Sequence, residues 1–426
     1  MENNSRKIWE KPWDYVEGYL VAGGIAVAGF ALQFSLGNVT PADFAFPINI
    51  ILGALFVIGL LCCHFFLKNN HIVRWLSGVR STIPALVVML VVIMLMGVLP
   101  QFTVYEPNEH LPDNFINRLG WYRMTTSWSF LLLSFYMLTV LGLATLRKTR
   151  QKPSWRHIGF YLNHAGLFIA FLAGIMGSAD MQRLTMSVRV GQTEWRAMDY
   201  HGKVSELPIA IELQDFIIEE YEPKLVVINT ETGRMLPEGR PDIYMYEEMG
   251  DRVTLHGNEI EVLEYLPEAA VMSDSLFATA VGFQGEGAAT ALKVRVTNPK
   301  LAEPIEGWVS NGSYVFPYKV LYIDDLTSVA MPVQEVKKYT SHVVVMTESG
   351  DNKQATIEVN KPLSIGSWKI YQFSYDESLG KYSKTSVFEL VYDPWLKVVF
   401  AGIFMLLAGS MFLFIVGPEK KGRTTK

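Results

Sequence analysis

Long apolar runs and one long polar stretch divide the chain. Six runs of about twenty residues have the length that an α-helix needs to cross the hydrocarbon core of a bilayer. The six runs are Gly18–Leu36, Phe46–Leu67, Ile83–Pro100, Trp128–Leu146, Ile158–Ser178 and Trp395–Val416. The pattern predicts an α-helical membrane bundle with six spans. The first run is diluted by polar residues at one end, so a helix lying on the membrane surface is the alternative for it.

The polar stretch Ala179–Pro394 separates the fifth run from the sixth and has a different periodicity. Ala355–Val359 alternates apolar and polar positions, and the runs Val343–Val345 and Val253–Val262 are rich in β-branched residues. Short strands with tight turns need burial of sheet against sheet. The stretch therefore predicts a large β-rich domain, as an antiparallel sandwich or a pair of small β units. The predicted domains are 1–178, 179–394 and 395–426.

The distribution of basic residues among the loops predicts the orientation of the bundle in the membrane. Basic residues gather in the head, the second loop, the fourth loop and the tail: Arg6, Lys7, Lys11; Lys68, Arg74, Arg80; Arg147, Lys148, Arg150, Lys152, Arg156; Lys420, Lys421, Arg423, Lys426. The alternate loops, Gly37–Ala45 and Gln101–Arg123, carry only Arg118 and Arg123. Cytoplasmic loops are the basic ones. We therefore expect a multi-pass protein of the cytoplasmic membrane, with both termini inside and residues 179–394 extracytoplasmic, on the periplasmic face.

Composition removes several classes of function. The mean hydropathy of +0.19 over 426 residues fits a membrane protein with one large polar domain. The two cysteines, Cys62 and Cys63, are adjacent, so neither a disulfide framework nor a CxxCH motif for covalent haem is present. The sequence has no nucleic-acid signature and no hydrolase constellation, and we predict no catalytic residue. The acidic residues near the start of the polar stretch are interpreted as a solvated strand edge: Asp215, Glu219, Glu220 and Glu222.

His164 is the deepest titratable residue in the predicted spans, roughly 10 Å from the cytoplasmic end of the fifth. Phe160, Phe168 and Phe171 share its helical face and would suit a flat aromatic macrocycle. One interpretation makes His164 an axial ligand to haem; the other makes it a histidine that hydrogen-bonds a neighbouring helix. The opposite face carries small residues that let another helix approach closely: Gly166, Ala170 and Gly174.

Several motifs resemble the ResB family of cytochrome c biogenesis proteins. They lie in the polar stretch, in the last span and around His164. They are Leu213-Gln-Asp-Phe, Val359-Asn-Lys-Pro-Leu363, Tyr371-Gln-Phe-Ser-Tyr375, Asp393-Pro394 followed by Gly402, and Asn163-His164-Ala165. Looser similarity is found at Leu76–Arg80 and Leu99–Gln101. The resemblance covers about Arg74 to Val416, so the first two spans are additional to the family pattern.

The resemblance implies a membrane subunit of a two-component cytochrome c synthase. Such a subunit works with a ResC/CcsA-like membrane partner, carries b-type haem across the membrane and presents it to the CxxCH of apocytochrome c. His164 would supply one axial nitrogen and a partner histidine the other, with Phe160, Phe168 and Phe171 facing the haem. Thiol-reducing proteins would act indirectly. We expect a positioning subunit rather than one that makes bonds.

Two other functions fit the same sequence. One is an assembly scaffold or chaperone that stabilises the partner and binds apocytochrome without touching haem. The other is a transporter or sensor with an outer ligand-binding domain, which predicts a small-molecule pocket in 179–394. The spans contain no paired charges and no inverted repeats, and this argues against a transporter.

Overall fold

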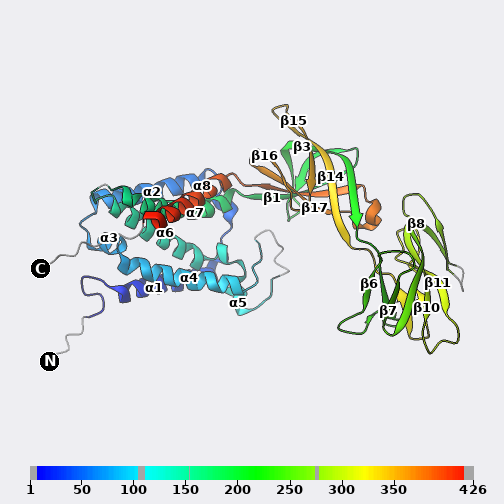
Figure 1. Cartoon of the computed structure of the whole chain (residues 1–426). Helices are drawn as coiled ribbons and strands as arrows, with labels where there is room; N and C mark the ends of the chain where they lie inside the picture. Colours follow the sequence, from blue (N-terminus) through cyan, green and yellow to red (C-terminus); the bar gives the residue numbers. More distant parts are fainter. Residues whose placement is uncertain (1–6, 104–110, 153, 274–277, 417–426) are drawn as a thin grey trace, which may run out of the picture. The chain divides into compact units, whose positions relative to one another are not determined.

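The computed structural model describes residues 7–103, 111–152, 154–273 and 278–416 (Figure 1). Arg6, residues 104–110 of the third loop and the basic tail from residue 417 onward lie outside the described residues. The chain forms two compact units. The helical unit comprises Met1–Arg183, Asp199–Lys203 and Val391–Lys426, and the β-rich unit comprises Leu184–Met198 and Val204–Leu390.

The helical unit contains six helices long and apolar enough to cross a membrane, as predicted. These are α1 (Tyr15–Leu36), α2 (Ile48–Phe66), α4 (Val79–Val98), α6 (Trp128–Lys148), α7 (Ile158–Asp180) and α8 (Leu396–Val416), with the short α3 (His71–Leu76) and α5 (Phe115–Arg118) between them. In α6, 61 % of the most apolar window is buried, against 22 % at most in the others. α6 is therefore the central helix.

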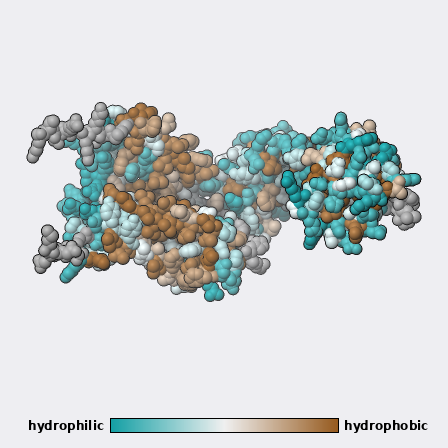
Figure 2. Space-filling model, turned by 60° about the horizontal axis from the view of Figure 1, so that its bottom comes forward, coloured by the Kyte–Doolittle hydropathy of each residue, from teal (hydrophilic) through white to brown (hydrophobic). Residues whose placement is uncertain are grey.

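The outer helices expose large apolar side chains, among them Phe66, Val98 and Phe414, each more than 80 % exposed. Figure 2 shows a broad hydrophobic surface along the sides of the helical unit and hydrophilic residues over one of its ends. An aqueous surface rarely carries so large an apolar area, whereas lipid favours it. The helical unit is thus built as a multi-pass membrane bundle.

α7 and α8 pack closely because glycine lines their contact. A Cβ added at Gly166 would lie 2.7 Å from the carbonyl oxygen of Gly402, and one added at Gly402 would lie 2.6 Å from the nitrogen of Ala170. Gly166 and Ala170 thus meet another helix as predicted, while a Cβ at Gly174 would meet nothing within 4 Å. Ser410 Oγ donates to Asn163 Oδ1 across the same contact, at 3.0 Å.

The end of α7 is fastened to the starts of α2 and α8. Asp180 accepts hydrogen bonds from the Phe46 backbone nitrogen (2.7 Å), Asn49 Nδ2 (2.7 Å) and Trp395 Nε1 (2.6 Å). α1 in turn packs against α4 and α6. The two helices that are additional to the family pattern are therefore integral parts of the bundle.

Between α7 and α8, the described residues form eighteen strands. Their bounds are β1 (Gln182–Arg189), β2 (Thr193–Met198), β3 (Val204–Glu220), β4 (Lys224–Asn229), β5 (Met235–Leu236), β6 (Ile243–Met245), β7 (Arg252–Leu255), β8 (Asn258–Ser273), β9 (Ala278–Gly282), β10 (Ala289–Thr297), β11 (Ile305–Ser310), β12 (Leu321–Tyr322), β13 (Thr327–Ala330), β14 (Val336–Thr347), β15 (Asn352–Glu358), β16 (Leu363–Ile365), β17 (Trp368–Tyr375) and β18 (Thr385–Tyr392). They form one eight-stranded sheet and two five-stranded sheets.

The predicted sandwich describes only part of this unit. The two five-stranded sheets, β12-β13-β4-β5 with β6 and β11-β10-β8-β7 with β9, share one apolar core in which Leu225 and Val227 meet Ile260 and Leu292. The eight-stranded sheet, in the order β15-β14-β3-β2-β1-β18-β17-β16, curls until β15 contacts β17. Sequence periodicity did not predict this nearly closed barrel, because closure depends on pairing between distant strands.

One local interpretation is corrected. Val253–Val262 is a hairpin rather than one run: β7 ends at Leu255, His256 and Gly257 take positive φ angles of 46° and 76°, and β8 begins at Asn258. The acidic residues Asp215 and Glu219 are exposed and lie in the last part of β3, which pairs with β14, whereas the pairing of β3 with β2 ends at Glu212.

Candidate functional site

His164 lies on α7, about two turns from its start, and its side chain is half-buried. Its Nδ1 is 3.0 Å from the carbonyl oxygen of Phe160, one turn earlier. A carbonyl only accepts hydrogen bonds, so Nδ1 must carry the proton and Nε2 is left with its lone pair in the neutral ring. Metal-bound histidines use the same division, with one ring nitrogen donating to a carbonyl and the other facing the metal.

The remaining nitrogen of His164 is available for a ligand. Among the described residues, none forms a hydrogen bond with Nε2, and no group of three or more His, Cys, Asp or Glu side chains could hold a metal ion. The ring is held in place by Phe160, which stacks on it at 3.8 Å between ring centroids.

The three phenylalanines predicted to face haem have different neighbours. Phe160 covers His164, as above. Phe168 packs between α2 and α6: it stacks with Phe56 at 6.2 Å, and its ring lies 3.1 Å from the Cβ that Gly142 would carry. Phe171 packs against buried residues of α4 and α6, Met89 among them. All three occupy the α7 face that looks toward the bundle, and their contact with haem stays a prediction.

His64, on α2, is a second histidine in the bundle and is only 7 % exposed. Its hydrogen bonds place the ring proton on the nitrogen that carries no proton in His164. Arg150 donates to the His64 carbonyl oxygen, and its Nη2 lies 3.3 Å from His64 Nδ1. Because arginine can only donate, Nδ1 accepts and the ring proton sits on Nε2. His64 in this tautomer cannot offer Nε2 to iron, so the geometry distinguishes the two intramembrane histidines.

An aromatic cluster near one end of the bundle was not predicted from the sequence. Trp13 packs edge-on against both His71 and Trp75, at 5.0 Å and 5.3 Å between ring centroids, and against Trp9. The Trp13 backbone N–H donates to His71 Nε2 at 3.4 Å. His71 is the first residue of α3. The i, i+4 spacings of Trp9 with Trp13 and of His71 with Trp75 were the available signal.

The motifs in the polar stretch have structural roles in the eight-stranded sheet. Gln372 lies inside the curled sheet, where its Oε1 accepts from Ser341 Oγ at 2.6 Å and its Nε2 donates to Ser386 Oγ at 2.8 Å. Ser341 and Ser386 are fully buried. Asn360 takes a positive φ of 64° in the turn between β15 and β16. These residues explain the Tyr-Gln-x-Ser-Tyr and Val-Asn-x-Pro-Leu patterns as parts of the fold rather than as chemistry.

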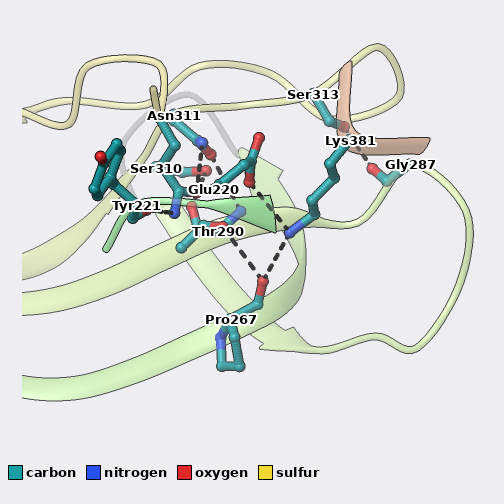
Figure 3. Close-up of polar contacts among 10 residues, drawn as sticks. Glu220, Tyr221, Pro267, Gly287, Thr290, Ser310, Asn311, Ser313 and Lys381 are labelled. Carbon is teal, nitrogen blue, oxygen red and sulfur yellow. Dashed lines mark hydrogen bonds and ion pairs between the residues drawn. The ribbon is translucent and has the colours of Figure 1, made fainter. Parts of the chain in front are cut away.

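A polar cavity of about 310 Å³ adjoins the end of β3. Glu220 and Lys381 form an ion pair at 3.9 Å on its wall, and Lys381 Nζ also lies 3.5 Å from the Pro267 carbonyl oxygen (Figure 3). Burial raises the pKa of Glu220, an effect that Lys381 partly offsets. Tyr382 Oη is buried there, and none of the described residues is its hydrogen-bond partner. Burial raises the pKa of Tyr382 to about 12.

Comparison with known proteins identifies one segment. Residues 314–385 match the model of the ResB-like family. The matched segment begins in the wall of the cavity beside Glu220, includes the turn at Asn360 and the strand β17 that holds Gln372, and ends at the start of β18. A search of curated proteins found no match to the chain. The resemblance seen in the motifs is thus confirmed at residues 314–385, where the chain is similar to the ResB-like family, and that family is associated with cytochrome c biogenesis.

Proposed function

We propose that this protein handles haem as one membrane subunit of a cytochrome c synthase. In this proposal b-type haem is the cargo, and neutral His164 supplies one axial nitrogen. A histidine of a ResC/CcsA-like partner supplies the other. The bundle lies in the cytoplasmic membrane with both termini inside, and the β-rich unit faces the periplasm. The ResB-like match supports the biological setting, and the bonding of His164 supports the site.

One observation carries the proposal: the hydrogen bond from His164 Nδ1 to the Phe160 carbonyl. It fixes the neutral tautomer that leaves the lone pair on Nε2, and the Phe160 ring restrains the imidazole plane. A histidine serving only to join two helices would be expected to bond across to another helix. His164 instead bonds within its own helix, which leaves Nε2 for a ligand brought by another molecule.

Attachment of haem to apocytochrome adds each cysteine S–H across a vinyl group, so that one S–C and one C–H bond form and nothing is oxidised. In this proposal the chain holds and positions haem for that reaction, and holding two reactants in the right geometry is one way in which a protein accelerates a reaction between them. The β-rich unit would hold the apocytochrome, by adding an extended peptide at a strand edge such as β15.

The test is an absorption spectrum of the chain purified alone and with its partner, as wild type and as His164→Ala. We expect the reduced b-type band to fall at least about tenfold in the variant, since loss of a ligand exceeds 1.4 kcal/mol. His157→Ala is the matched control, because His157 precedes the same helix and only contacts Tyr161 edge-on. His164→Gly should regain the band when imidazole is added.

An unchanged band in His164→Ala, with the complex intact, would contradict the proposal. Haem would then be bound wholly by the partner, and this chain would be the assembly scaffold. Loss of the complex itself in His164→Ala is distinguished by size-exclusion chromatography. In that case the imidazole rescue of His164→Gly decides, because a purely structural histidine would not be replaced by a free ligand to iron.

A further inference from the structure

A second cavity, of about 220 Å³, opens where α2 and α6 end and α3 begins. Its wall includes four cationic side chains and the buried ring of His64. The cations are Lys68, Arg74, Arg147 and Arg150. No carboxylate lines the cavity, and within the described ranges none forms an ion pair with any of the four. Figure 2 shows that hydrophilic residues cover one end of the bundle.

Two of the cations are held in fixed positions. Arg147 Nη1 donates to the Arg74 carbonyl oxygen at 3.2 Å and lies 3.4 Å from Ser77 Oγ. Arg150 is held in place by its Nη2, which donates to the carbonyl oxygen and to Nδ1 of His64. A guanidinium has five N–H donors, and these bonds engage a single nitrogen of each group. The remaining donors are pre-oriented, so an incoming anion would bind without first ordering the side chains.

The positive-inside tendency explains the sign of these charges but not their convergence. All four cavity cations are exposed, as Lys152 and Arg156 are, but Lys152 and Arg156 do not line the cavity. The four cations instead surround one small space beside the nearly buried His64. Like charges gathered around one space repel each other, and an anion bound there would relieve the repulsion.

The cavity lies close to the depth of His164 in the bundle. Leu60 of α2 and Phe168 of α7 both approach Gly142 of α6. His64 follows Leu60 by one helical turn toward the end of α2, and His164 precedes Phe168 by one turn toward the start of α7. The end of α6 and the start of α7 are joined by a short loop, so both turns lead toward the same end of the bundle.

We infer that this cavity binds an anionic group, a carboxylate or a phosphate, at the end of the bundle where α2 and α6 end. Two sources share that chemistry. One is the propionate carboxylates of haem, in which case the inference rests on the proposed function and deepens it. The other is the phosphate of an anionic phospholipid, which needs no haem. Charge-assisted bonds from arginine suit both.

The experiment uses the full chain with its partner in lipid nanodiscs. Lys68→Gln/Arg74→Gln removes two charges whose head groups make no described hydrogen bond, so the Arg147 and Arg150 contacts stay intact. Lys152→Gln/Arg156→Gln is the matched control, removing two charges from the same end outside the cavity. Haem and haem dimethyl ester are titrated into each protein. Phosphatidylglycerol retention against phosphatidylcholine is measured by native mass spectrometry.

If the anion is a propionate, wild type and control bind free-acid haem about tenfold more tightly than the diester, and the cavity variant loses that preference. If it is a phosphate, the variant loses retained phosphatidylglycerol while the control keeps it. Either result supports the inference. If both measurements are the same in all three proteins, the inference is wrong. A His164-dependent haem band would still stand in that case, and the phospholipid result would stand without haem, so the two proposals can fail separately.

Discussion

The two units of this protein satisfy their internal polar groups with different partners. In the helical unit, His164, His64 and Asp180 bond to backbone atoms, neutral side chains or an anchored arginine. In the β-rich unit, carboxylates such as Glu358 and Glu261 each pair with two cations. Water screens and supports the charges of a soluble surface, whereas a membrane bundle gains by keeping its polar groups neutral or bonded to backbone.

The largest effect on stability is expected from a substitution at the contact of α7 with α8 in the helical unit. Gly402→Leu places a branched side chain where even a Cβ would lie 2.6 Å from the α7 backbone. We expect the helices to separate, at a cost of about 3 kcal/mol or more, with a matching fall in the thermal unfolding midpoint in detergent. Gly174→Leu is the control, since its Cβ has open space. Equal effects of the two substitutions would show that the glycine contact is not what holds α7 to α8.

The buried hydrogen-bond network at Gln372 differs from the ion pairs of the β-rich unit, because all of its members are neutral. Gln372→Leu leaves the hydroxyls of Ser341 and Ser386 without their amide partner, and we expect about 1–3 kcal/mol of lost stability in denaturant unfolding. The triple variant Ser341→Ala/Gln372→Leu/Ser386→Ala should recover most of that loss, because the two buried hydroxyls that lost the amide are then also removed. A triple variant weaker than the single one would count against this explanation.

The smallest expected effect concerns the ion pairs of Glu358. Hydrogen bonds from Lys338 and Lys361 lower the pKa of Glu358 from 4.5 to about 2. A pKa lowered in the folded state stabilises above the unfolded value and loses that contribution as the pH falls from about 4.5 toward 2. Glu358→Gln should therefore flatten the fall of the unfolding midpoint across that window. Glu303→Gln, at an exposed carboxylate, serves as the control, and identical pH profiles for the two would contradict the assignment.

The helices could be predicted from the sequence because their signal is local. A run of twenty apolar residues specifies a span by itself, and each predicted run overlaps one long helix of the structure. The sheets could not be predicted in the same way. β3 pairs with β14, which comes more than a hundred residues later, and local periodicity carries no signal for a pairing over that separation.

In the candidate site, too, features set by local sequence could be predicted, and features set by tertiary packing could not. The position of His164 within a span followed from its place in an apolar run. Its tautomer did not, because that depends on which atom lies 3.0 Å from Nδ1. The cationic cavity was also hidden: its basic residues come from separate loops, and only the packing of α2, α3 and α6 brings Lys68 and Arg74 beside Arg147 and Arg150.

The bond between Asp180 and Trp395 has a consequence for how such a chain could have been assembled. It joins the residue that ends α7 to the residue just before α8, with 2.6 Å between the two side chains, although more than two hundred residues separate them in sequence. Adjacent ends are what a domain insertion requires of its host. A few residues could bridge this junction, so the helical unit has the geometry of a complete bundle into which the β-rich unit was spliced.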